Sequence, residues 1–210
     1  MAQPPDLSRE ALQTDTRSLA LARWLSQALN PFVSGVACYL IISLFAPIDL
    51  FAGLGWAALA LAIQLTPSIA LYTIRRRQGI YSDADVSVRE ERNEIYVVGS
   101  ISVLIAIAVL IAAGAPAPYL AMTIGIFGLG IICGIINLIW KISMHSSAIA
   151  SLATVALIYS AILGIVFWIC ALAVGWARIR TRNHTPLQVL GGLTVAAVVM
   201  TISFSLVGTA

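Results

Sequence analysis

The chain has only two histidines, His145 and His184, and each lies beside basic residues at the edge of an apolar stretch. Histidine can act as a nucleophile or a general acid near neutral pH. Arg92 and Arg178 lie at similar edges, and an arginine offers a planar fork that matches phosphate oxygens. These four residues suit phosphoryl transfer, in which one histidine attacks phosphorus and the other protonates the leaving alkoxide, while the arginines hold the developing charge.

Apolar blocks must carry these residues. Of the 210 residues, 60% are hydrophobic and only 10% are charged, whereas a soluble domain usually has about a quarter charged residues. Blocks near twenty residues match the length that a helix needs to cross a bilayer, and no alternating pattern indicates a β-barrel. The fold class we expect is all-α, a polytopic transmembrane helix bundle. The net charge of +3 is small, and no basic stripe indicates a nucleic-acid partner.

Six to seven spans are expected. Five apolar blocks are clear, and they cover roughly 32–46, 51–74, 95–114, 119–139 and 187–207. The stretch 148–176 would be about 43 Å long as one helix. Two helices that turn near Ser160 to Gly164 would instead place all twelve Lys and Arg on one side. The cytoplasmic side is enriched in these residues, so seven spans and cytoplasmic polar loops, in a bacterial-type inner membrane, are preferred.

The N-terminal part, residues 1–30, differs from the rest. Residues 1–17 are expected to form a disordered polar tail. The apolar spacing of Leu21, Trp24, Leu25 and Leu29 then predicts an amphipathic helix that lies in the interface. The three cysteines lie in apolar stretches and are interpreted as small buried hydrophobes, with no disulfide or metal framework.

Three polar clusters, at 83–94, 141–147 and 178–188, share one membrane face in the seven-span arrangement. The third reads Ala177-Arg178, five residues, His184, three residues, Gln188. It resembles the type-2 phosphatidic acid phosphatase superfamily, which has Ser-Arg, five residues, His, three residues, Asp. The arginine and the histidine match in identity and spacing.

The other two clusters match this family in part and in the same order. Ile142-Ser143-Met144-His145 stands against Pro-Ser-Gly-His, and Asp85, six residues, Arg92-Asn93 stands against Lys, six residues, Arg-Pro. The resemblance covers roughly residues 75–208, so 31–210 is expected to be a transmembrane phosphatase-like domain. It implies that His184 is the nucleophile and His145 the general acid, that Arg92, Ser143 and Arg178 bind phosphate, and that no metal or other cofactor is required.

Two departures from the family pattern affect the charge of the site. Gln188 replaces the Asp that orients the nucleophilic histidine, and its amide can accept a hydrogen bond but carries no charge. Asp85 replaces a phosphate-binding Lys. Arg89, one helical turn from Arg92, or Lys141 would then supply the missing positive charge.

The resemblance implies a phosphoric monoester hydrolase: a lipid phosphate phosphatase or phosphotransferase that works through a phosphohistidine. Phosphatidic acid, phosphatidylglycerol phosphate and polyprenyl phosphate or diphosphate all stay open as substrates, as do water or another acceptor and the oligomeric state. A first alternative is a Mg²⁺-dependent prenyl or lipid transferase. It would use the acidic residues of the first cluster, which are Asp83, Asp85, Glu90, Glu91 and Glu94. A second alternative is a non-catalytic membrane protein with a degraded phosphate pocket.

Overall fold

The computed structural model describes residues 7–86 and 88–209, with the side chains from Asp15 onward. All regular structure in this part of the chain is helical. The elements are α1 (Leu7–Ala28), α2 (Pro31–Phe45), α3 (Leu50–Arg77), the short 3-10 helix η1 (Glu90–Arg92), α4 (Asn93–Ala112), α5 (Ala117–Ile139), α6 (Met144–Tyr159), α7 (Ala161–Arg180) and α8 (Pro186–Val207).

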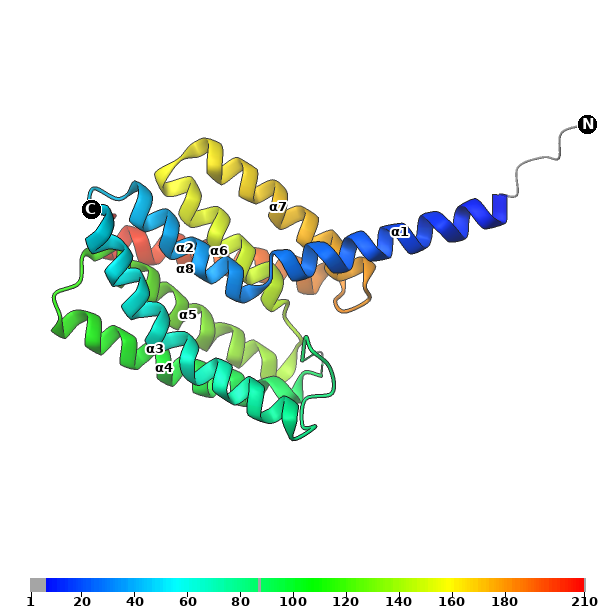
Figure 1. Cartoon of the computed structure of the whole chain (residues 1–210), viewed down its shortest axis with the longest axis horizontal. Coiled ribbons are helices and arrows are strands. Elements are labelled where there is room, and N and C mark those ends of the chain that lie inside the picture. Colours follow the sequence, from blue (N-terminus) through cyan, green and yellow to red (C-terminus); the bar gives the residue numbers. More distant parts are fainter. Residues whose placement is uncertain (1–6, 87, 210) are drawn as a thin grey trace, which may run out of the picture.

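Helices α2 to α8 run back and forth along one direction (Figure 1). The loops 78–92, 140–143 and 181–185 therefore meet at one end of the bundle, which we call the polar end. The opposite end holds only short connections, at 46–49, 113–116 and Ser160. The three polar clusters thus lie together at one end of the bundle, as expected.

The stretch 148–176 is broken, as the charge argument predicted. Helix α6 ends at Tyr159, and Ser160 caps α7 by accepting a hydrogen bond from the backbone N–H of Leu163. Gly164 lets the two helices pack closely, because a Cβ there would lie 2.5 Å from Leu157 Cα. A larger residue would force this tight helical hairpin apart.

Five helices are long and apolar enough to cross a membrane: α3, α4, α5, α7 and α8. A sixth span forms if Asp15–Ala28 and Pro31–Phe45, bent by 49° at their junction, count as one. Helix α6 has 16 residues and is about 24 Å long, shorter than a hydrocarbon core of roughly 30 Å. Its N-terminus is therefore recessed, and it joins α5 through the extended segment 140–143 (Figure 1).

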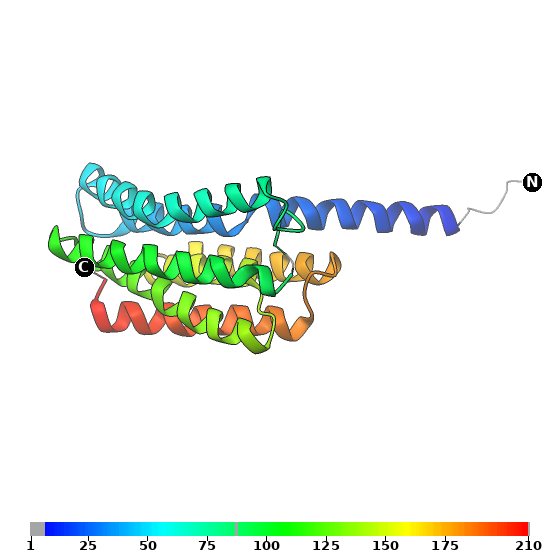
Figure 2. The same cartoon turned by 90° about the horizontal axis from the view of Figure 1, so that it is seen from below.

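The expected N-terminal helix forms, but it begins at Leu7. The prediction of a disordered tail over residues 1–17 is therefore wrong for residues 7–17. Residues 1–6 lie outside the described part. Helix α1 extends past the bundle at its polar end (Figure 2). Its C-terminal half packs against α7, where Arg180 forms an ion pair with Asp15 and a hydrogen bond with Ser18.

Candidate functional site

The polar end gathers all five residues predicted to act on phosphate. Arg92 ends η1 at the start of α4, Ser143 is the N-cap of α6, His145 lies in the first turn of α6, Arg178 lies in the last turn of α7, and His184 precedes α8. All five side chains are buried. Helices α4, α6 and α8 begin here, so the partial positive charge of three helix N-termini adds to that of the arginines.

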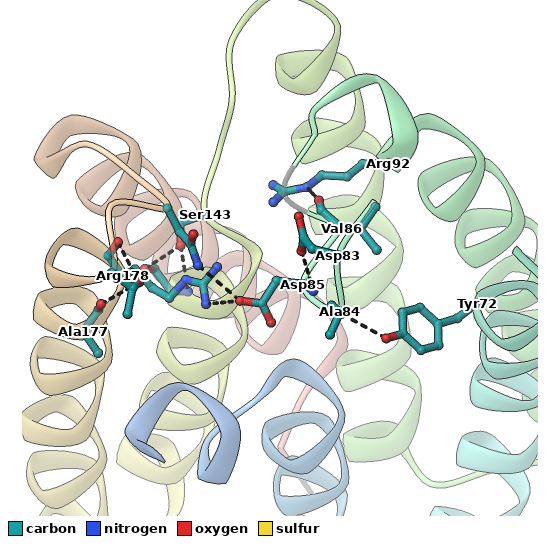
Figure 3. Close-up of polar contacts among 12 residues, drawn as sticks. Tyr72, Asp83, Ala84, Asp85, Val86, Arg92, Ser143, Ala177 and Arg178 are labelled. Atoms are coloured by element: carbon teal, nitrogen blue, oxygen red, sulfur yellow. Dashed lines mark hydrogen bonds and ion pairs between the residues drawn. The ribbon is translucent and has the colours of Figure 1, made fainter. Parts of the chain in front are cut away.

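Arg178 is the most deeply buried cation at this end, with 1% of its surface exposed. Its Nη1 donates to Asp85 Oδ2 at 2.7 Å (Figure 3). Its Nε and Nη2 have no hydrogen-bond partner among the described residues. These two atoms form one edge of the guanidinium, which can bind two oxygens of a carboxylate or phosphate side by side. Buried donors left unpaired are costly, so this edge indicates a site for an anion.

Arg92 holds the loops of the polar end together. Its Nε donates to the carbonyl of Val86 at 2.6 Å (Figure 3). Its Nη1 donates to the carbonyl of Ile142 at 3.1 Å. The first bond fixes the loop before η1, and the second fixes the segment before α6. Arg92 therefore has two roles: it contributes a positive charge to the site, and its hydrogen bonds position residues from two of the three clusters.

The ring of His184 is oriented by Gln188. His184 Nδ1 lies 3.3 Å from Gln188 Oε1, and the same oxygen accepts a hydrogen bond from the backbone N–H of Thr185. Because that N–H can only donate, the Gln188 atom is an oxygen, and Nδ1–H of His184 must be the donor. The Nε2 atom then carries the free lone pair that a nucleophile needs.

The same histidine is kept neutral. Burial lowers the pKa of His184 to about 3, and the charges of Arg92, Arg178 and Lys141 contribute in the same direction. An unprotonated imidazole is the reactive form of a nucleophile. An incoming anion would offset the nearby positive charges.

Ser143 ties the recessed start of α6 to α8. Its backbone N–H donates to the carbonyl of Gln188 at 3.3 Å, and its Oγ accepts from the backbone N–H of Ser146. The hydroxyl of Ser146 also donates to Ser143 Oγ at 2.9 Å. Gly192 of α8 packs so closely that a Cβ there would lie 2.7 Å from the Ser143 carbonyl oxygen. The turn that carries Ser143 and His145 is therefore rigidly placed.

The two basic residues expected to replace the missing lysine differ in position. Lys141 lies near the site, because its positive charge contributes to the lowered pKa of His184. Burial also lowers the pKa of Lys141 itself. Arg89 does not reach the site. Its guanidinium binds Glu90 and the carbonyl of Leu138 at the end of α5, so Lys141 is the better placed of the two.

Sequence reasoning missed Asn183, whose Nδ2 donates to Asp85 Oδ2 at 3.2 Å. The only signal for it in the sequence was its position between Arg178 and His184. In the structure, the backbone N–H groups of Asn183 and His184 both donate to the carbonyl of Arg178, which forms a turn. That turn brings the three residues close together, and the side chains of Arg178 and Asn183 both bind Asp85.

A cavity of about 500 Å³ opens onto the site. Helices α2 and α3 pack closely near Ser43 and Gly53 and diverge toward the polar end (Figure 1). The cavity lies among α2 to α6, and α8 contributes Met200 to it. Its lining at the polar end is Asp85, Arg92 and His145; its deep lining includes Tyr39, Gln64, Met122 and Met200. Most of this lining is apolar, so the cavity suits a hydrocarbon chain better than water.

The acidic residues of the first cluster do not converge. Asp85 binds Arg178, Glu90 binds Arg89, Glu94 binds Arg75, and Glu91 accepts from Ser82. In residues 7–86 and 88–209, no three His, Cys, Asp or Glu side chains lie together as a metal site needs.

No family model, curated protein or solved structure matches the chain.

Proposed function

We propose that this integral membrane protein is a lipid phosphate phosphatase or phosphotransferase that works through a phosphohistidine on His184. The observation that carries the proposal is the unpaired Nε–Nη2 edge of the buried Arg178, whose charge acts on both His145 and His184. A buried edge of this kind matches two phosphate oxygens.

In the proposed first step, His184 Nε2 attacks phosphorus and the bond to the lipid oxygen breaks. Burial and the charge of Arg178 lower the pKa of His145 in the free site, so His145 takes up a proton as the bound phosphate offsets that charge. It gives this proton to the lipid oxygen, and the lipid alcohol leaves. In the second step a water or an alcohol attacks the phosphohistidine, His145 takes its proton, and His184 is regenerated. Arg92, Arg178 and Ser143 hold the phosphoryl oxygens throughout, and Gln188 keeps Nδ1–H of His184 oriented.

The lipid substrate is supported by the cavity. Asp85, which pairs with Arg178, lines an apolar space of about 500 Å³ inside the bundle, so a phosphate on Arg178 would lie next to that space. The cavity is lined by both α2 and α3, at Phe32 and Leu61 among others, and a chain would enter it from the bilayer between these two helices. We propose that the headgroup binds at the polar end and one chain occupies the cavity. Chemically, phosphatidic acid, phosphatidylglycerol phosphate and polyprenyl phosphates all fit this description.

The polar end is proposed to face the cytoplasm of a bacterial-type inner membrane. Nine of the twelve Lys and Arg, those from Arg75 to Arg182, lie in or beside its three loops. Such an excess of basic residues marks the cytoplasmic side. Arg182 is exposed, so a cysteine there should react with a membrane-impermeant maleimide only after the cells are opened; labelling of intact cells would contradict the orientation.

A second candidate is a protein that binds a lipid phosphate without turning it over. The observation that favours it is the Asp85–Arg178 ion pair, which already places one negative charge on a phosphate-binding arginine.

The experiment that separates the two is phosphate release from a panel of lipid phosphates by purified protein with chelator present. We expect release by the wild type, loss of release in His184→Ala, and normal release in the control Arg182→Ala, which alters an exposed residue of the same loop. Binding without release from any lipid would favour the second candidate. Release that needs Mg²⁺ would return the transferase to consideration.

A further inference from the structure

The cavity closes at one level inside the bundle, and we call this closed end the floor. Six helices line the cavity, and the deepest lining residues, one from each of α2, α3, α4, α5, α6 and α8, are Tyr39, Leu61, Val103, Met122, Ser151 and Met200. The residues one turn further from the polar end are buried and do not line the cavity: Ile42, Ala57, Ala106, Tyr119, Val155 and Phe204. Among the described residues, the cavity therefore stops at this level on all six helices.

Hydrogen bonds across three helices hold the floor rigid. Thr123 Oγ1 donates its proton to the carbonyl of Tyr119 at 2.7 Å. The hydroxyl of Tyr39 must therefore donate to Thr123 Oγ1, 2.7 Å away, and it accepts from Gln64 Nε2 at 2.8 Å. The rings of Tyr39 and Tyr119 also stack, with their centroids 6.3 Å apart. Opening this network inside a bilayer would leave polar groups without partners, so the floor does not yield easily to a chain that presses on it.

The depth of the floor matches the length of one leaflet. At about 1.5 Å per residue, Val103 lies about 15 Å from the start of α4 at Asn93, and Met122 lies about 25 Å from the end of α5 at Ile139. The hydrocarbon of one leaflet is roughly 15 Å thick, half of the bilayer core. The cavity thus reaches about the middle of the bilayer and ends there.

We propose that the floor limits the length of the lipid chain that this protein accepts, and that Met122 and Met200 set the limit. A chain of about one leaflet's length fits above the floor. A longer chain would have to overpack a closed and rigid part of the bundle, which is unfavourable. The inference rests on the proposed lipid phosphate site and narrows its substrates: phosphates of ordinary chains fit, whereas phosphates of long polyprenols do not.

The test measures binding of a series of n-alkyl phosphates, from octyl to eicosyl phosphate, to the full-length protein in detergent. Each probe is added at a fixed mole fraction, and the rise in Tm reports binding. The wild type should bind probes up to one chain length and bind longer probes about tenfold more weakly. Phosphate release from the same probes is measured in parallel.

Met200→Ala should lengthen the accepted chain by about two carbons, because it removes most of a side chain at the floor. A Cβ at Gly125 would lie 2.7 Å from Met200 Sδ, so the methionine fills the space beside this glycine, and its loss opens that space to the cavity. The matched control is Met144→Ala, which makes the same change in a residue that lines the cavity at the polar end. It should leave the limit where it is in the wild type.

A second variant moves the limit in the opposite direction. Val103→Phe adds a ring at the floor, where Val103 lines the cavity, so it should shorten the accepted chain. A general loss of stability cannot lengthen the accepted chain in one variant and shorten it in the other. The opposite shifts therefore keep the test valid even if Met200→Ala lowers the Tm.

The same limit in Met200→Ala, Val103→Phe and the wild type would overturn the proposal, as would undiminished binding up to the longest probe, which would mean that the chain leaves between α2 and α3. Phosphate release without a length limit would leave the phosphatase and remove the role of the floor. A limit that moves with the variants, but without phosphate release, would support the floor in a protein that only binds lipid phosphates. A lack of binding to every probe would overturn the proposed function together with this inference.

Discussion

Arg178→Lys should separate the geometry of the anion site from its charge. Lysine keeps one positive charge at the end of α7, and its ammonium can still pair with Asp85, which now lies 2.7 Å from Arg178 Nη1. It cannot reproduce the Nε–Nη2 edge, because a lysine has a single nitrogen. The variant should therefore fold, since the partly buried carboxylate of Asp85 keeps a partner. It should lose the two parallel bonds that we assign to phosphate.

The loss follows from those two bonds. A hydrogen bond that involves a charged group contributes about 1.5–3 kcal/mol, so two bonds contribute roughly 3–6 kcal/mol. At about 1.4 kcal/mol per factor of ten, kcat/KM should fall by roughly 10² to 10⁴. The assay is release of phosphate from a lipid phosphate by purified protein in detergent, with Tm measured on the same preparations.

The matched control is Arg180→Lys, two residues further along α7. Arg180 faces α1, where it binds Asp15 and Ser18, and has no contact with the site. It should keep kcat/KM within a factor of about three, as expected for a change at a surface ion pair. If Arg178→Lys folds and behaves like Arg180→Lys, Arg178 does not bind phosphate through its edge and the reasoning is refuted.

Three further predictions concern pH, the cavity and the α6–α7 hairpin. The pKa of His184 is about 3 in the folded protein and near 6.5 in the unfolded chain. As the pH falls from 7 to 4, the unfolded chain therefore takes up a proton that the folded protein does not, and the Tm should decrease. His184→Asn should make this decrease smaller. An equal decrease in the variant would refute the assignment. Gly99→Leu, whose Cβ would meet only Ser68 Oγ at 3.9 Å, should displace at least two methylenes of a bound chain and lower kcat/KM by about tenfold for long-chain lipid phosphates, with little effect on p-nitrophenyl phosphate. Gly55→Leu, in an exposed and open position on α3, is its control, and equal losses in both variants would contradict a chain-binding cavity. Gly164→Ala should cost about 1–3 kcal/mol of unfolding free energy, because its Cβ would lie 2.5 Å from Leu157 Cα. Gly128→Ala, where the nearest atom is 3.5 Å away, should cost much less in the same denaturation experiment, and equal costs would contradict the close α6–α7 packing.

The bundle was predictable because the lengths of the apolar blocks indicate the helices, and the positions of the basic residues indicate which loops share one end. The break at Ser160 is a clear example. Local residues marked it only weakly, but placing all basic residues at one end required it, and α6 and α7 separate at that residue. The start of α1 at Leu7 was missed because a polar segment without apolar periodicity carries no length signal.

The site residues were predictable where their spacing fixes their geometry. Arg178 and His184 are joined by a turn in which the backbone N–H of His184 bonds the carbonyl of Arg178, so the spacing between them determines their proximity. The bond between His184 and Gln188 likewise follows from a separation of four residues at a helix start.

The remaining features depend on long-range packing and were not predictable. Asp85 and Arg178 are 93 residues apart in the chain, and nothing local indicates that a carboxylate in the place of a lysine binds the neighbouring arginine. The cavity is lined by residues from α2, α3, α4, α5 and α6, which are far apart in the sequence. Arg89 was expected near the site from its spacing to Arg92, but the tight turn of η1 directs it toward Leu138 instead.

The most direct test of the account is to trap the covalent intermediate. Purified protein is mixed with a ³²P-labelled lipid phosphate, denatured within milliseconds at alkaline pH, which preserves phosphohistidine, and digested for mass spectrometry. The account predicts label on the peptide that contains His184, and loss of label in His184→Ala. Label on another residue, or steady phosphate release by a protein that never becomes labelled, would contradict it.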